Sequence, residues 1–147
     1  MIRTALDDLP RPPSAKLLGW HLIDARPEDG WVRIGFEGSH AFCNPAGFIQ
    51  GGILSAMLDD TMGPAVFLKS QGRSYTATIS LTVNFIAPAE PGALVAEAQV
   101  IQLGGTVAFM QGQISRADGK LIATATANAR LLDSGRALAP RAIHAGA

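Results

Sequence analysis

The chain has 147 residues, 48% of them hydrophobic and 16% charged, which suits one compact domain with a sizeable core. Twelve basic residues balance twelve acidic ones, so bulk charge gives no reason to expect binding to nucleic acid or to an anionic membrane. A single cysteine excludes an internal disulfide framework, no apolar run approaches the ~18 residues of a membrane span, and acidic residues stand where a signal peptide needs an apolar run. We therefore expect one domain over residues 1–147 of a soluble cytoplasmic protein, with neither nucleic acid nor membrane as a partner.

Short apolar or alternating segments, separated by Gly and Pro, predict the elements of the first third of the chain. In chain order they are a short helix or arm over residues 1–13 that stops at its prolines, a brief helical turn capped by Ser14 and ending at Leu18, a strand over 19–25, a turn over 27–30 and a strand over 31–36. The two strands should pair as a hairpin. Residues 38–48 are rich in Gly, Ser, Asn and Pro and predict an irregular loop, a place where functional sites are common.

A long helix is predicted from Ile53 onward, because apolar residues recur there about every 100°. The stripe consists of Ile53, Leu54, Met57, Leu58, Thr61 and Ala65. Asp59 falls on the side opposite this stripe, and Asp60 falls on its flank. Gly63 and Pro64 predict a kink or an end, since Pro64 cannot donate to the Asp60 carbonyl and its ring crowds that oxygen. Another turn could follow over residues 66–68.

The second half of the chain is predicted to be rich in β-structure, because polar and apolar residues alternate along it. The expected strands cover residues 75–86, 94–102, 106–115 and 121–132, with turns at 88–92, at Gly104-Gly105 and at 117–120. From Asp133 onward the small, polar, Pro-containing sequence predicts a mobile tail. The element order ββ-α-ββββ predicts an α+β fold in which one antiparallel sheet wraps a single long central helix.

The start of this helix is the most informative segment of the chain. Gly51 and Gly52 lead directly into the apolar helix, and glycine lets the backbone approach a ligand closely. The first N–H groups of a helix lack internal partners and lie at the positive end of its dipole, where a developing oxyanion is stabilised. A carboxylate about two turns further along can handle a proton or a water molecule. This pattern indicates a hydrolytic site at a helix N-terminus.

The run Asn44-Pro45-Ala46-Gly47-Phe48-Ile49-Gln50-Gly51-Gly52, followed by an Asp in mid-helix, resembles the active-site signature of hotdog-fold acyl-CoA thioesterases. The resemblance is to the phenylacetate-pathway (PaaI-like) and 4-hydroxybenzoyl-CoA thioesterase type. Residues 80–89 resemble the long third strand of that family and its following Pro turn, and residues 104–109 and 119–123 resemble its last two hairpins. The resemblance covers residues 15–132 and implies the hotdog fold, with an N-terminal arm and a C-terminal tail outside the core.

The resemblance implies a role for each residue of the motif. Asp59 matches the catalytic carboxylate, which activates water as a general base or attacks the thioester carbonyl directly. Gly51 matches the residue whose N–H polarises that carbonyl, Asn44 the amide that orients carbonyl or water, and Thr78 a hydroxyl beside the attacking water. Gln50 stands where many members have His, so it can form hydrogen bonds but cannot titrate. Further contacts to the substrate are expected from Gly52, Arg73, Gly105 and Thr106.

The implied reaction is hydrolysis of an acyl- or aryl-acyl-CoA thioester, without metal or other cofactor. In this family two protomers share a site, so we expect a homo-oligomer, either a dimer or a dimer of dimers and thus commonly a homotetramer. The phosphates of CoA should attract a strip of cations at the pocket mouth. The candidates are Lys69, Arg73, Arg116 and Lys120.

Other interpretations remain open at this point. Residue by residue, Asp59 could be an ordinary solvent-facing side chain, Asp60 a partner for a cation or a competitor of Asp59, Asn44 a loop starter and Thr78 a plain β-former. Cys43 beside the motif has no evident base partner, and the three histidines lack metal-ligand spacing. For the whole chain, the alternatives are a hotdog hydratase or dehydratase and a non-catalytic acyl-CoA binding module.

Overall fold

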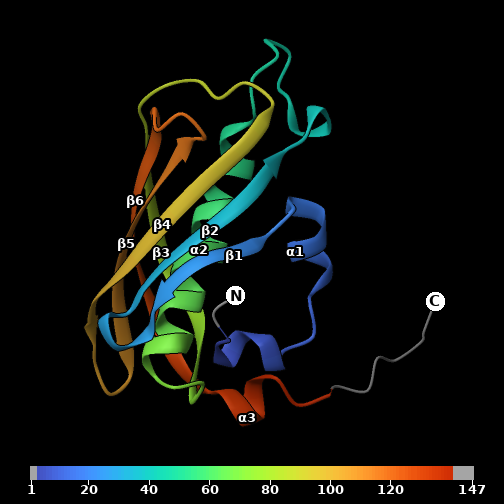
Figure 1. Ribbon diagram of the computed structural model, residues 1–147. Helices are drawn as coiled ribbons and strands as arrows, with labels where there is room; N and C mark the ends of the chain where they lie inside the picture. Colours follow the sequence, from blue (N-terminus) through green and yellow to red (C-terminus); the bar gives the residue numbers. More distant parts are fainter. Residues whose placement is uncertain (1–2, 141–147) are drawn as a thin grey trace, which may run out of the picture.

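A computed structural model describes residues 3–140 as six strands in one antiparallel sheet that curls around a long helix (Figure 1). The strands are β1 (His21–Arg26), β2 (Trp31–Gly38), β3 (Ser74–Phe85), β4 (Gly92–Leu103), β5 (Val107–Arg116) and β6 (Leu121–Asp133), and their order in the sheet is β1-β2-β4-β5-β6-β3. The helices are α1 (Pro13–Leu18), α2 (Gly51–Lys69) and α3 (Ser134–Ala137), with short 3₁₀ turns η1 (Ala5–Asp8), η2 (Pro27–Asp29) and η3 (His40–Phe42). The predicted α+β order and the central helix are confirmed.

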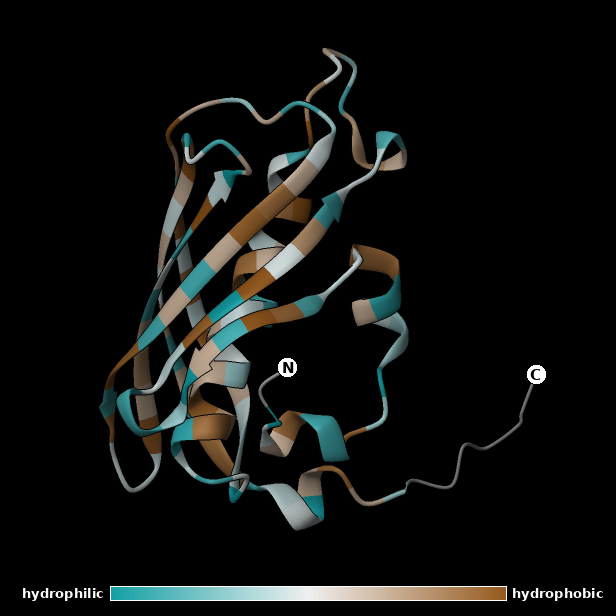
Figure 2. Ribbon diagram, viewed as in Figure 1, coloured by the Kyte–Doolittle hydropathy of each residue, from teal (hydrophilic) through white to brown (hydrophobic). Residues whose placement is uncertain are grey.

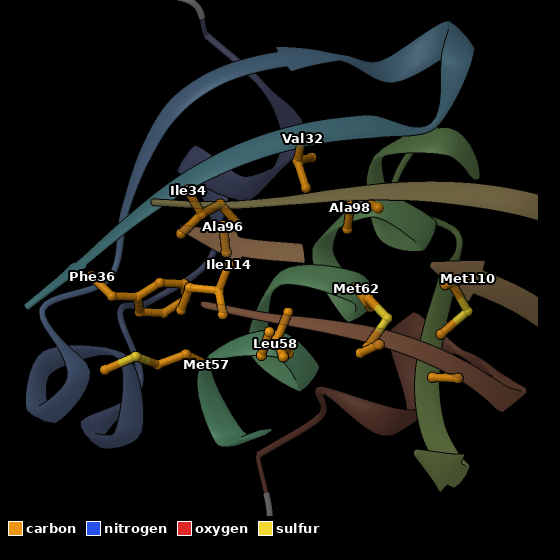
Figure 3. Close-up of a cluster of buried hydrophobic side chains, with 14 of the residues drawn as sticks. Val32, Ile34, Phe36, Met57, Leu58, Met62, Ala96, Ala98, Met110 and Ile114 are labelled. Atoms are coloured by element: carbon orange, nitrogen blue, oxygen red, sulfur yellow. The ribbon is translucent and has the colours of Figure 1, made fainter. Parts of the chain in front are cut away.

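The core lies between α2 and the concave face of the sheet. Along the strands, hydrophobic and hydrophilic residues alternate, as Figure 2 shows, so that one face can be buried. Met57, Leu58 and Met62 of α2 are fully buried against Phe36 and Ile114 of the sheet (Figure 3). Of the predicted helical stripe, Leu54, Met57, Leu58, Thr61 and Ala65 are buried, and Ile53 is partly buried. Alternating small alanines line β6, which lets the helix lie close to the sheet.

Helix α2 does not end at Gly63-Pro64, so the predicted end at this point is wrong. It continues for another turn to Lys69, as residues 66–68 suggested. Pro64 has no N–H to donate to the carbonyl of Asp60. That carbonyl instead accepts a hydrogen bond from the indole Nε1–H of Trp20 at 3.0 Å. A side chain from outside the helix therefore satisfies the backbone oxygen that the proline leaves free.

Two predictions near the ends of the chain need correction. Ser14 is not the cap of α1, because Pro13 already occupies the first helical position, as is common for proline. The mobile tail predicted from Asp133 onward is wrong for its first part, since the Asp133 side chain caps α3 by accepting from the Arg136 N–H. The Ser134 N–H also donates to the Arg73 carbonyl at 3.0 Å. The rest of the predicted tail, residues 141–147, lies outside the described residues.

Strand β3 lies at one edge of the sheet and exposes apolar side chains. It is twelve residues long and pairs on one side only, with β6. Its register shifts between Thr78 and Ser80, which leaves Ile79 in a bulge with 62% of its surface exposed. A long edge strand of this kind is a template for pairing with another chain.

Among residues 3–140, no helix is both long and apolar enough to cross a bilayer.

Candidate active site

The predicted irregular loop before α2 is closed by backbone hydrogen bonds. Cys43 and Ile49 form an antiparallel bridge, and the Asn44 N–H donates to the Phe48 carbonyl at 2.7 Å. The Ile49 N–H donates to the Ala89 carbonyl at 2.8 Å, which joins the loop to the segment between β3 and β4. These bonds hold the residues that enter α2 in one place.

The first two N–H groups of α2 are free to bind a ligand. The carbonyl of Gln50, the N-cap residue, accepts from the N–H groups of Ile53 and Leu54, and its side chain makes no capping hydrogen bond. Within residues 3–140, the N–H groups of Gly51 and Gly52 have no acceptor. They lie at the positive end of a 19-residue helix, where a negatively charged oxygen is stabilised.

Packing leaves little room for a side chain at Gly51. A Cβ at this position would lie 3.1 Å from Cζ of Phe85, the last residue of β3. A Cβ at Gly52 would lie 2.8 Å from Oε1 of Gln50, whose flexible side chain could move away. Phe85 therefore belongs to this site, although the sequence analysis did not single it out. The sequence did contain a signal for Phe85, since Leu81, Val83 and Phe85 are every second residue of the predicted strand and so lie on one face of it.

Asn44 organises the loop and faces a pocket. Its Oδ1 accepts hydrogen bonds from the N–H groups of Ala46 at 3.0 Å and Phe48 at 3.1 Å, so the loop-starting role is real. Its side-chain nitrogen has no partner within the described part of the chain. Asn44 and Gly51 line a pocket of about 320 Å³. Its other walls include Phe48, Leu54, Phe85, Ile86 and Pro88.

Asp59 and Thr78 form the second group of predicted site residues. The Thr78 hydroxyl donates to Oδ1 of Asp59 at 2.8 Å and so fixes the carboxylate. Asp59 is half-buried on the side of α2 that faces β3, and Thr78 lies immediately before the β3 bulge. The contact gives Thr78 more than the packing role of a plain β-former, and among residues 3–140 Oδ2 of Asp59 accepts no hydrogen bond.

The two groups do not meet within one chain. Asp59 follows Gly51 by eight residues, which separates them by about 12 Å along the helix. Neither Asp59 nor Thr78 lines the pocket that holds Asn44 and Gly51. One chain therefore carries two separate halves of the predicted site. One half holds the carboxylate of Asp59 with Thr78, and the other holds Asn44 and the N–H of Gly51.

The predicted cations and turn residues are likewise divided between the two ends of the sheet (Figure 1). Lys69 is the last residue of α2, and Arg73 follows the helix. The Lys69 Nζ donates to the Glu28 carbonyl at 3.2 Å, and the Arg73 Nε donates to the Ser70 carbonyl at 3.1 Å. The turn with Gly105 and Thr106 lies at this same end, because the Thr106 carbonyl accepts from the Leu131 N–H.

Arg116 and Lys120 lie at the opposite end, Arg116 as the last residue of β5 and Lys120 in the turn before β6. Arg116 forms an ion pair with Asp118, with 2.8 Å between Nη2 and Oδ2. The turn adjoins the end of β3, since the N–H groups of Ile86 and Ala87 both donate to the Ile122 carbonyl. These two cations are therefore on the Gly51 side of the chain, whereas Lys69 and Arg73 are on the other side.

Asp60 is a second acid beside the candidate base. Burial and, to a lesser extent, the neighbouring Asp59 charge raise the pKa of Asp60 from 3.8 to about 6. Its Oδ2 is buried and accepts no hydrogen bond within residues 3–140, and no cation there pairs with it. The like-charge effect anticipated for adjacent acids is present, but desolvation is the larger cause.

Cys43 and the potential metal ligands were the remaining candidates near the motif. Cys43 lies 3.6 Å from the Gly47 carbonyl through its Sγ, and this is its one side-chain hydrogen bond among residues 3–140. Within that part of the chain, no group of three or more His, Cys, Asp or Glu side chains is placed to hold a metal ion.

Comparison with known proteins gives consistent relatives. Residues 46–123 match the family model described as the thioesterase superfamily. The chain is 35% identical to a phenylacetic acid degradation-related protein of Ralstonia eutropha, described as a thioesterase, with a TM-score of 0.79 over 84% of this chain and 92% of that one. It is 29% identical to a thioesterase family protein of Silicibacter pomeroyi, with a TM-score of 0.77 over 86% and 94% of the two chains.

Two further relatives extend this result. The PaaI protein of Escherichia coli has a TM-score of 0.73 over 82% of this chain and 85% of that one, and at 20% identity it supports the fold alone. A Saccharolobus solfataricus protein described as an esterase is 32% identical over 84 residues, which are 57% of this chain and 59% of that protein. The match thus spans less than two thirds of the curated relative. Together the matches confirm the hotdog thioesterase resemblance that the motif indicated.

Proposed function

Because the chain belongs to the thioesterase superfamily, we propose that it hydrolyses acyl- or aryl-acyl-CoA thioesters to a free acid and CoA. The observation that supports this most is the pairing of two functions on one helix. The Thr78 hydroxyl donates to the carboxylate of Asp59 at 2.8 Å, and within residues 3–140 the N–H groups of Gly51 and Gly52 at the helix start have no acceptor. The first is suited to take a proton, and the second to stabilise an oxyanion.

A second copy of the chain brings the two halves together. Antiparallel pairing of two β3 edges about a two-fold axis places the start of one strand beside the end of the other. The Asp59 and Thr78 half of one protomer then faces the Asn44 and Gly51 half of its partner, twice per dimer. The same symmetry places Lys69 and Arg73 of one protomer on the side of Arg116 of the other, which supports a composite cation strip for the CoA phosphates.

In the proposed reaction, Oδ2 of Asp59 takes a proton from water while the water oxygen forms a bond with the thioester carbonyl carbon. The carbonyl electrons move to oxygen, and the N–H of Gly51 stabilises the resulting oxyanion. The amide nitrogen of Asn44 is available as a further donor. Collapse of the intermediate breaks the C–S bond, and the CoA thiolate takes the proton from Asp59. Direct attack by Asp59, with hydrolysis of the resulting anhydride by water, uses the same groups.

The test is thiol release from a series of acyl-CoAs by the purified protein. Asp59→Asn should raise the activation free energy by about 2–4 kcal/mol and so lower kcat/KM roughly 30- to 1000-fold, while the fold is retained. Asp60→Asn is the matched control and should stay within a few-fold of the wild type. Hydration of an enoyl-CoA without thiol release would instead identify a hydratase, and tight acyl-CoA binding without turnover a binding module.

The shared site is tested separately by breaking the β3 edge. Ile79→Lys places a charge on the exposed bulge and should yield monomers, observed by sedimentation, whose turnover is largely lost. Leu17→Lys is the control, because Leu17 of α1 is as exposed, at 68%, and is remote from this edge. A fully active monomer would contradict the shared site while leaving the thioesterase activity standing.

A further inference from the structure

Phe85 stands directly over the candidate oxyanion site. It is the last residue of β3 and lies on the α2-facing side of the strand, yet 54% of its surface is exposed. Two of its ring atoms, Cζ and Cε1, lie 3.1 Å and 3.2 Å from where a Gly51 Cβ would be. A large apolar ring is thus placed next to a backbone N–H that has no acceptor in the described part of the chain.

This position brings the ring against the acyl group of a bound thioester. A carbonyl oxygen that accepts from the Gly51 N–H lies about 2.9 Å from that nitrogen. The ring lies against the same residue, so it borders the space in front of this N–H that the carbonyl carbon and the acyl carbons next to it would enter. The space for substituents is therefore most limited at the carbons adjoining the carbonyl.

The pocket behind Gly51 has the character of an acyl site. Of the side chains that line its 320 Å³, Asn44 is the one that is polar, and none is charged. Phe48, Leu54 and Ile86 supply apolar walls. A charged acyl group would be desolvated there without a partner, which is strongly unfavourable. The amide-rich pantetheine arm would similarly find few partners, whereas an apolar acyl group gains by burial.

We propose that Phe85 is a specificity-determining residue, a wall that selects uncharged acyl groups that are unbranched or planar next to the carbonyl and rejects α-branched ones. The proposal rests on the thioesterase function proposed above and deepens it by naming the acyl class. A flat ring accommodates a straight chain or a planar ring at van der Waals distance, but a methyl branch on the α-carbon meets it directly.

The experiment compares butyryl-CoA with isobutyryl-CoA as substrates of the same size. The wild type should prefer butyryl-CoA, and Phe85→Ala should reduce the ratio of the two kcat/KM values by at least about tenfold, the effect of a methyl-sized change in a pocket. Phe109→Ala is the matched control, since Phe109 is 46% exposed on β5 and does not line this pocket. It should leave the ratio unchanged.

A second variant and a second readout keep the outcome decisive. Phe85→Leu retains an apolar side chain and serves if the alanine variant fails to fold, with circular dichroism and oligomeric state measured for both. Affinities for the ketone analogues of butyryl-CoA and isobutyryl-CoA, in which CH2 replaces the thioester sulfur and the carbonyl is kept, report the same selectivity without hydrolysis. An inactive wild type that still binds the straight-chain ketone more tightly would refute the thioesterase function and support the role of Phe85. Equal loss for both substrates, or an unchanged ratio, would overturn the role of Phe85.

Discussion

The indole N–H of Trp20 donates at 3.0 Å to the backbone carbonyl of Asp60, the oxygen that Pro64 cannot serve. Trp20 follows α1 at the start of β1, so the contact joins the N-terminal segment to the middle of the central helix. It lies one residue from the candidate catalytic Asp59. The N-terminal segment thus supports the part of α2 that carries the site.

Trp20→Phe should lower the free energy of unfolding by about 1–2 kcal/mol, because an aromatic ring is kept while the partly buried carbonyl loses its donor. Pro64→Ala restores a backbone N–H that can reach the same carbonyl, so Trp20→Phe should cost less in that background. Urea unfolding of the two single variants and the double variant measures the coupling. Equal costs in both backgrounds would show that the hydrogen bond does not compensate for the proline.

Thr78→Val should raise the activation free energy by about 1–2 kcal/mol and so lower kcat roughly 5- to 30-fold, since the carboxylate of Asp59 loses the hydroxyl that orients it. Thr78→Ser keeps the hydroxyl and should recover most of the activity. Thr82→Val, an exposed threonine further along β3, is the control. Steady-state kinetics with one acyl-CoA measures kcat for these variants. An unchanged kcat in Thr78→Val would show that Thr78 has only a packing role.

Asn44→Asp and Asn44→Ala separate two functions of one side chain. The aspartate keeps an oxygen for the N–H groups of Ala46 and Phe48, whereas the alanine removes it and should cost about 1–2 kcal/mol of stability. Both variants lose the amide donor, so both should turn over acyl-CoA more slowly. If Asn44→Asp retains wild-type turnover, Asn44 serves the loop alone.

Asp60→Asn should make the protein more stable above about pH 6. The pKa of Asp60 is raised to about 6 in the folded state, chiefly by burial, so the folded protein holds this proton more tightly than the unfolded chain. The contribution of protonated Asp60 to the stability is fully present below the pKa of this group in the unfolded chain. It is lost as the pH rises through the pKa in the folded protein. Urea unfolding of both proteins at about pH 5 and pH 8 tests this, and a variant that is less stable at pH 8 would contradict it.

Local patterns were sufficient to predict the elements and the family. The alternation in residues 75–86 and 121–132 specifies strands because side chains of a strand point to opposite faces in turn, whatever the strand pairs with. The stripe from Leu54 to Ala65 specifies a helix for the analogous reason, and Gly51-Gly52 marks its start. The candidate base Asp59 and the candidate N–H donor Gly51 were named from their match to the motif of the hotdog thioesterases.

Only the tertiary structure decided how these parts meet. The helix passes Pro64 because Trp20, forty residues before Asp60 in the chain, supplies a donor, and no local rule contains that partner. Sheet order places β3 at the edge, brings Thr78 to Asp59 and lays Phe85 over Gly51. Spacing along the helix separates Gly51 from Asp59 by about two turns, so these two residues of the motif lie in different halves of the candidate site. The sequence by itself determined which residues form helices and strands and which faces of them are apolar, because helix and strand periods are local properties. Their partners depend on contacts between distant segments, and those exist only in the folded chain.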